Sequence, residues 1–130
     1  MVVDASAVVA LLLDEPDAEG FRARLLNAGR SLISPVNHWE VLARAHSHGG
    51  EAARREAETI MARFGIQVAT LDVASSRAAV DAFARFGRRT PAGLNLGDCF
   101  AYALAAAEGD GLVCKGEDFP KTDILVLGPT

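Results

Sequence analysis

The chain opens with MVVDASAVVALLL (residues 1–13), in which a short apolar run ends at Asp4 and a stretch of helical period follows. The same alternation recurs along the chain. Apolar runs predict strands at 1–3, 31–34, 66–69, 112–114 and 124–127, and helical periodicity predicts helices at 5–13, 17–28, 35–48, 51–64, 73–86 and 96–108. Because strands separated by helices pair in parallel through right-handed crossovers, we expect a three-layer α/β/α sandwich around a central parallel sheet of about five strands.

Composition sets the broad class of the protein. Half of the 130 residues are hydrophobic and 23% are charged, which predicts one domain over residues 1–130 with a buried core. The apolar run near the N-terminus is too short to cross a bilayer and lacks the pattern of a signal peptide, so we expect a cytoplasmic protein. Cys99 and Cys114 have no nearby partner cysteine, and we expect both to be buried, reduced thiols.

Charge is unevenly distributed along the chain. The net charge of −4 argues against general coating of DNA, but residues 21–89 hold eleven arginines, whereas acidic residues dominate both ends. If the two ends meet in space, the fold makes a negative pocket beside an arginine-bearing middle. Such a pocket suits a metal site next to a polyanion.

Four acidic residues are candidates for that pocket, because ligands of a parallel sheet bind at the carboxyl ends of its strands. Asp4 ends the first predicted strand, and Asp118 follows the fourth. Glu40 lies in the second turn of the helix after the second strand, and Asp98 lies in the first turn of the last long helix. The sequence therefore predicts that four carboxylates converge at one edge of the sheet.

Each acid also has a purely structural alternative. Asp4 can cap the helix that follows it, Asn95 and Asp98 fit a capping box, Glu40 can face solvent, and Asp118 can belong to the turn at 116–120. Capping alone does not require acids on the same edge of one sheet, so their joint placement favours a cluster.

Such a cluster favours a divalent cation. Carboxylates at close range raise one another's pKa values, and a cation offsets that repulsion. Oxygen ligands favour Mg²⁺ or Mn²⁺ over Zn²⁺, which points to hydrolysis of phosphate esters. His38, His46 and His48 lack the spacing of a shared ligand face, and no glycine-rich nucleotide-binding motif is present. A phosphorylatable receiver module would need an acidic pair after the first strand, where Asp4 stands alone.

Four segments together resemble the PIN-domain ribonucleases, specifically the VapC-type toxins of bacterial toxin–antitoxin pairs. They are residues 2–7, 34–43, 94–105 and 115–123, in the order that is found in this family. The resemblance implies that Asp4, Glu40 and Asp98 are the core metal-binding acids, with Asp118 as the fourth and Ser6 as an accessory polar residue. Glu117 and Asp123 compete with Asp118 for the fourth position. Many relatives have threonine where this chain has Cys114.

The same resemblance implies the activity and the partners. It implies an endoribonuclease that cuts RNA with Mg²⁺ or Mn²⁺, forms a homodimer, and is inhibited by a cognate antitoxin whose C-terminal segment covers its groove. The apolar faces of residues 5–28 and 35–48 are candidate partner surfaces, or else part of the core. The alternative function is a catalytically silent PIN-like binding module. The RNA sequence that is cut, the number of metal ions and the identity of the antitoxin stay open.

Overall fold

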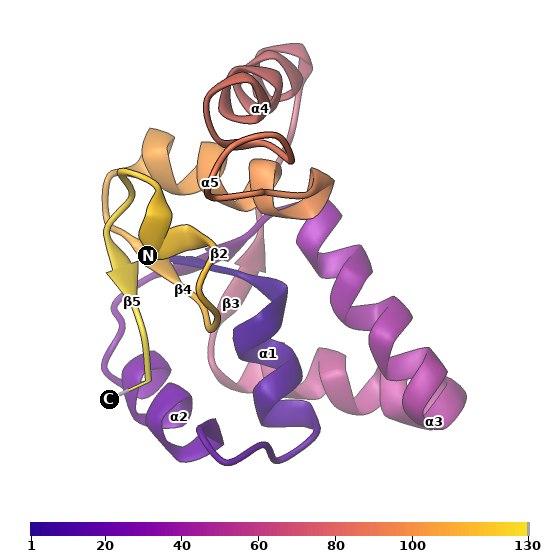
Figure 1. Ribbon diagram of the computed structural model, residues 1–130. Helices are drawn as coiled ribbons and strands as arrows, with labels where there is room; N and C mark the ends of the chain where they lie inside the picture. The colour runs from indigo at the N-terminus through magenta and orange to yellow at the C-terminus, as the bar shows by residue number, and fades with distance from the viewer. Residues whose placement is uncertain (130) are drawn as a thin grey trace.

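A parallel sheet lies at the centre of the computed structural model, which describes residues 1–129. Within those residues it has five strands, in the order β3-β2-β1-β4-β5 (Figure 1). The strands are β1 (Val2–Val3), β2 (Ser31–Ile33), β3 (Ile66–Val68), β4 (Leu112–Val113) and β5 (Val126–Leu127). Each falls within its predicted segment and is one or two residues shorter. The predicted parallel sheet is therefore confirmed.

The helices also follow the predicted periodicity. They are α1 (Ala5–Leu12), α2 (Ala18–Leu26), α3 (Pro35–Arg63), α4 (Val73–Phe86) and α5 (Leu96–Glu108), with a single 3₁₀ turn at Phe119–Lys121. The label α3 covers two helices that meet at a kink, which confirms the two helices predicted at 35–48 and 51–64. Its backbone leaves helical geometry at Gly49 and Gly50, where Gly50 has a φ of 66°. Glycine tolerates that left-handed φ, so the pair ends the first helix and lets the second start at an angle to it.

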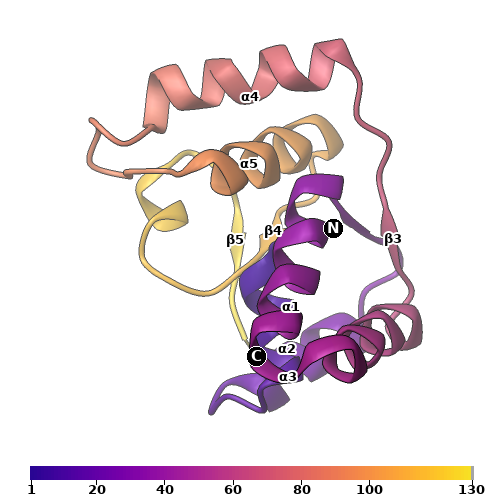
Figure 2. The ribbon, with the colours of Figure 1, turned by 90° about the vertical axis from the view of Figure 1, so that its right-hand side faces the viewer.

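Helices cover both faces of the sheet and create two cores, because alternate strand residues point to opposite faces. Val3 packs with α1, α2 and α3, whereas Val2 packs with α5 and part of α4. Figure 2 shows α4 lying on α5, on the side of α5 away from the sheet. This arrangement is the expected three-layer α/β/α sandwich. Within residues 1–129, no helix has both the length and the apolar character needed to cross a membrane.

The carboxyl ends of the central strands position the predicted acids. Asp4 directly follows β1, and its backbone N–H donates to the Val113 carbonyl of β4 at 2.9 Å. In the sheet, β1 lies between β2 and β4, so the next strand along the chain is on one side of β1 and the fourth strand is on the other. Open parallel sheets bind their ligands at such a change of strand order.

Candidate functional site: a cluster of carboxylates at the sheet edge

Asp4 lies at the base of the site, where β1 turns into α1. Its carboxylate accepts a hydrogen bond from the Ser6 backbone N–H at 3.0 Å, and the residue is only 6% exposed. Burial raises the pKa of this carboxyl group, although the hydrogen bonds from Ser6 and Ala5 oppose the shift. Asp4 therefore caps α1, as the structural alternative predicts, and its carboxylate is buried at the end of β1.

Glu40 reaches the same edge from the second turn of α3, and a buried amide holds it there. The Asn37 side-chain amide donates to Glu40 Oε1 at 2.7 Å and to the Gly97 carbonyl of α5 at 3.0 Å. The oxygen of the same amide accepts from the Ser34 hydroxyl at 2.6 Å. Burial raises the pKa of Glu40, the hydrogen bond from Asn37 lowers it, and the charge of Asp4 raises it further. The alternative that Glu40 points freely into solvent is wrong.

Gly97 makes room for the Glu40 carboxylate. A Cβ atom at this position would lie 2.4 Å from Glu40 Oε2 and 2.5 Å from Oε1, closer than van der Waals contact permits. The backbone of Gly97 does not have a positive φ. The glycine is therefore required by the close approach of Glu40 and not by its own conformation. Sequence reasoning missed both Asn37 and Gly97.

Asp98 follows Gly97 in the first turn of α5 and forms the predicted capping box. Its backbone N–H donates to the Asn95 side chain at 2.9 Å, and its carboxylate accepts from the Asn95 backbone N–H at 3.1 Å. Burial raises the pKa of Asp98 to about 6; the Asn95 hydrogen bond opposes this shift, and the charges of Asp4, Glu40 and Asp118 add to it. Asp98 is thus a helix cap and also the residue on which the charges of the other three acids converge.

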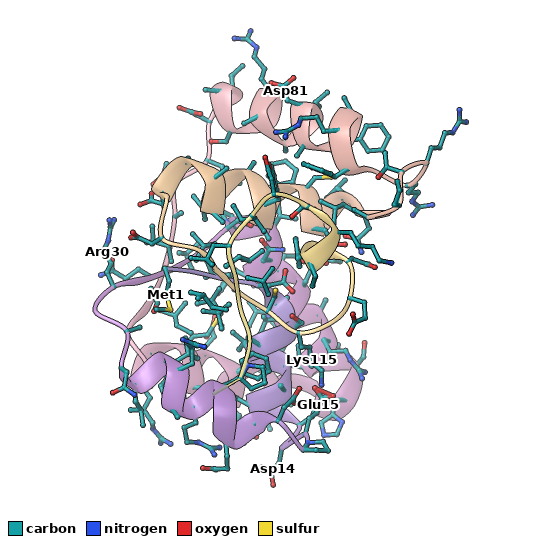
Figure 3. All side chains as sticks on the ribbon, turned by 60° about the vertical axis from the view of Figure 1, so that its left-hand side comes forward. Met1, Asp14, Glu15, Arg30, Asp81 and Lys115 are labelled. Carbon is teal, nitrogen blue, oxygen red and sulfur yellow. The ribbon has the colours of Figure 1, made fainter. Side chains whose placement is uncertain are left out.

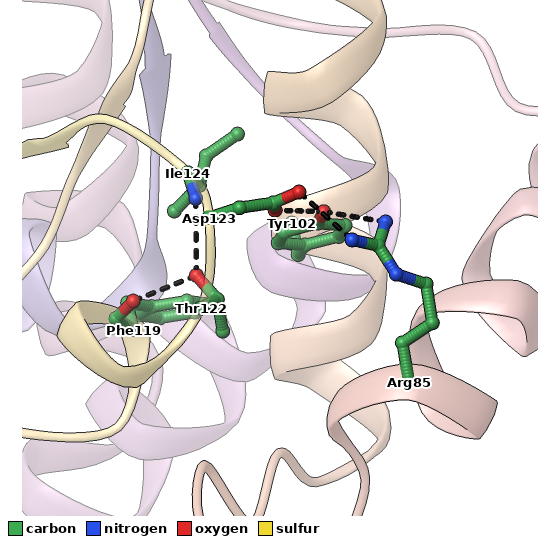
Figure 4. Close-up of polar contacts among 6 residues, drawn as sticks. All are labelled: Arg85, Tyr102, Phe119, Thr122, Asp123 and Ile124. Atoms are coloured by element: carbon green, nitrogen blue, oxygen red, sulfur yellow. Dashed lines mark hydrogen bonds and ion pairs between the residues drawn. The ribbon is translucent and has the colours of Figure 1, made fainter.

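Asp118 fits the fourth position better than its two competitors. It precedes the 3₁₀ turn, and its charge is one of those that raise the pKa of Asp98. Asp123 instead accepts hydrogen bonds from Tyr102 Oη and from Arg85, the latter at 2.8 Å (Figure 4). Glu117 makes no hydrogen bond or ion pair within residues 1–129.

A second polar connection supports the base of the site. The Lys115 backbone N–H donates to Ser6 Oγ at 3.1 Å, which links the segment after β4 to the residue whose backbone N–H donates to Asp4. The Lys115 ammonium lies between Glu15 and Asp17, 3.2 Å from an oxygen of each, and Figure 3 shows Lys115 beside Glu15. Ser6 therefore contributes by holding the backbone around Asp4, and the Lys115 charge is already neutralised.

The chemistry of the donor groups fits a hard divalent cation. The four acids offer only oxygen ligands, which Mg²⁺ and Mn²⁺ prefer. Burial raises the pKa of the Cys114 thiol to about 12, with the charges of Asp4 and Asp98 adding to the shift, so this neighbour stays a neutral thiol and a poor ligand. Both cysteines are buried and free, as expected. Within the described chain, however, no three His, Cys, Asp or Glu side chains are already arranged to hold a metal ion. The charge of Asp4 acts on both Glu40 and Asp98.

Comparisons with known proteins agree with this fold. The family model described as "PIN domain" matches residues 1–125. Ribonuclease VapC30 of Mycobacterium tuberculosis is 40% identical over 128 residues, which cover 98% of each chain. Among solved structures, M. tuberculosis VapC20, described as a toxin that cleaves the sarcin–ricin loop, superposes with a TM-score of 0.77 at 17% identity over 95% of each chain. A toxin–antitoxin complex from Klebsiella pneumoniae gives a TM-score of 0.73 at 18% identity, covering 99% of this chain and 97% of that one.

The two solved structures establish the fold alone, because their identity to this chain is low. The family model and the 40% identical relative span nearly the whole sequence, including every acid of the cluster. The chain therefore belongs to the PIN-domain family, within its VapC branch.

Proposed function

We propose that this protein is a divalent-metal-dependent endoribonuclease that acts as the toxin of a toxin–antitoxin pair. The observation that carries the proposal is the placement of Asp4, Glu40 and Asp98 at one edge of the sheet from three separate elements. Burial raises the pKa of each, and the charge of Asp4 adds to the shift for Glu40 and Asp98. Capping and hydrogen bonding account for each acid singly, but they do not require the acids to lie together, where their repulsion destabilises the fold. The 40% identical relative is named a ribonuclease, which supports the same activity for this chain.

The residues of the cluster have distinct proposed roles. Asp4 and Asp98 hold the cation, Glu40 binds it directly or through a water molecule, and Asp118 orients the attacking water or completes a second, weaker site. When bound, Mg²⁺ or Mn²⁺ supplies an activated water and offsets the charge of the reacting phosphate. Asn37 fixes one oxygen of Glu40 and leaves Oε2 for the ligand. Hydrolysis then leaves a 5′-phosphate and a 3′-hydroxyl, the leaving oxygen taking up a proton.

Two protein partners belong to the proposal, a cognate antitoxin and a second copy of this chain. Residues 5–28 and 35–48 supply mostly core, and only Leu26 and Trp39 of their large apolar side chains are strongly exposed. A group of exposed apolar side chains lies instead on α4 and at the start of α5, and it comprises Val73, Val80, Phe83 and Leu96. Contiguous apolar surface of this kind is typical of protein interfaces. Sedimentation at micromolar concentration tests the dimer: we expect the mass of two chains, and a monomer would refute it.

RNA cleavage tests the activity. Total cellular RNA is incubated with the purified chain in Mn²⁺, in Mg²⁺ or in EDTA, and the cut ends are mapped. We expect cleavage that needs the metal and is abolished by Asp4→Asn. Asp81→Asn removes the same charge from exposed α4 and serves as the matched control. Cleavage in EDTA, or equal cleavage by Asp4→Asn and wild type, would refute the mechanism. Metal binding without cleavage of any RNA would favour the silent binding module.

A further inference from the structure

The bend in α3 creates a hollow that the proposed chemistry does not use. Its lining comes from both halves of the helix and consists of Trp39, Leu42, Ala43, His46, Ser47 and Arg54. In a straight helix, Trp39 and Arg54 would be about 22 Å apart along the axis. The non-helical backbone at Gly49 and Gly50 turns the second half of α3, and both residues then line one hollow. Figure 1 shows this bend where α3 turns back beneath the molecule.

The hollow combines an exposed aromatic ring with an arginine that has no partner in the described residues. Trp39 is the only tryptophan of the chain, and it is 67% exposed. The Arg54 guanidinium makes no hydrogen bond or ion pair within residues 1–129, whereas the adjacent Arg55 is paired with Glu51 at 3.0 Å. No acidic residue lines the hollow. An exposed aromatic face beside an unpaired cation is complementary to a nucleotide, because the base stacks on the ring and the phosphate meets the guanidinium.

The hollow and the carboxylate cluster share the first half of α3. Trp39 directly precedes Glu40, so their Cα atoms are about 3.8 Å apart. Glu40 lies against Gly97 of α5, whereas Trp39 lines the hollow. A nucleotide held on Trp39 would therefore be bound at the helical turn that carries Glu40.

We propose that the hollow is a binding subsite for one nucleotide of single-stranded RNA, in which Trp39 stacks on the base and Arg54 contacts a backbone phosphate. Of the two strongly exposed aromatic rings, Trp39 lines this hollow, whereas Phe83 lies on α4. The subsite rests on the proposed ribonuclease function and adds where the substrate lies relative to the acids. Single strands are favoured over duplexes, because only an unpaired base offers its face to an indole.

Because the chain has one tryptophan, its fluorescence reports on the subsite directly. Wild-type protein in EDTA is titrated with a mixed-sequence single-stranded RNA 10-mer, with a duplex of the same sequence, and with an abasic 10-mer of equal charge. We expect saturable quenching of Trp39 emission by the single strand and little quenching by the other two. Quenching that does not distinguish the abasic strand would overturn the stacking role.

Variants test the two residues separately, by anisotropy of a labelled RNA 10-mer in EDTA. We expect Trp39→Ala to weaken binding about fivefold or more and Trp39→Phe to restore most of the affinity. Arg54→Gln should lower the slope of log affinity against log salt by about 0.7, whereas Arg55→Gln, the matched loss of a paired charge, should change it less. Thermal unfolding of each variant checks that it is folded.

The outcomes separate this proposal from the function on which it rests. Metal-dependent RNA cleavage together with unchanged binding by Trp39→Ala and Arg54→Gln would overturn the subsite and leave the ribonuclease intact. Absence of both cleavage and RNA binding would refute the ribonuclease and the subsite with it. Trp39 emission that changes with protein concentration and not with RNA would assign the hollow to a second copy of the chain, and emission that changes only when a purified antitoxin is added would assign it to that partner.

Discussion

Replacing Gly97 with alanine is a demanding test of the site, because the substitution adds one methyl group and removes no functional atom. The new Cβ would lie 2.4 Å from Glu40 Oε2, so the carboxylate must retreat by about 1 Å to reach ordinary contact. The Asn37–Glu40 hydrogen bond, now 2.7 Å long, would then stretch beyond about 3.5 Å and be lost.

The expected magnitudes follow from this displacement. Losing a hydrogen bond to a charged group costs about 1.5–3 kcal/mol, and alanine in place of glycine inside a helix returns about 0.5–1 kcal/mol. We therefore expect Gly97→Ala to lower the free energy of unfolding by about 1–2 kcal/mol. Displacement of a catalytic group by 1 Å lowers activity about 100-fold, so kcat/KM for RNA should fall far more than the stability does.

Thermal unfolding and RNA cleavage rates measure the two effects. Gly29→Ala is the matched control, because a Cβ at Gly29 would meet no atom within 4 Å. Adding Glu40→Ala to Gly97→Ala should remove the steric conflict, so stability should recover although activity does not. Full activity in Gly97→Ala, or strictly additive effects of the two substitutions on stability, would refute the position assigned to Glu40.

Other predictions concern the charges and the buried amide. Burial in the folded state raises the pKa of Asp98 to about 6. The protonated carboxyl therefore contributes its full stability below the pKa of the unfolded chain, and this contribution is lost as the pH rises through 6 because the buried group must then ionise. Asp98→Asn should therefore raise the free energy of unfolding at pH 8 in EDTA by about 1–2 kcal/mol after allowance for solvent screening, and change it little at pH 3; urea titrations that show no gain at pH 8 would contradict this. Asn37→Ala should destabilise the fold by about 1–3 kcal/mol, since it strips a fully buried network, and should slow RNA cleavage as Glu40→Ala does; cleavage at the wild-type rate would show that the amide does not position Glu40. Asp118→Asn should slow cleavage about tenfold or more, whereas Asp123→Asn should leave it within about twofold, and the reverse order would exchange the two assignments.

The sequence predicts the order of the elements well, because each element carries its own signal. The strand before Asp4, the Ser34–Pro35 start of α3 and the Asn95–Asp98 capping box are all encoded within a few residues. The glycine pair at 49–50 marks the boundary between the two helices of α3 correctly, but not the angle at which they meet. That angle depends on what packs against the second helix, which local periodicity does not record.

The acids could be predicted, whereas the groups that hold them could not. Asp4, Glu40 and Asp98 were found because the carboxyl ends of parallel strands share one edge. The roles of Asn37 and Gly97 could not be predicted, because the contact between them joins residues 60 positions apart and depends on how α3 crosses α5. A glycine in the first turn of a helix, directly before an acid, was the one available signal for the close approach.

The account's central claim is that the buried carboxylates form a site for a divalent cation, and calorimetric titration with Mn²⁺ tests it most directly. We predict one or two saturable binding events for the folded wild-type chain at pH 7.5, a loss of about tenfold or more in affinity in Asp4→Asn, and unchanged affinity in Asp81→Asn. A folded protein that binds no Mn²⁺, or that binds it equally well without the Asp4 carboxylate, would contradict the claim.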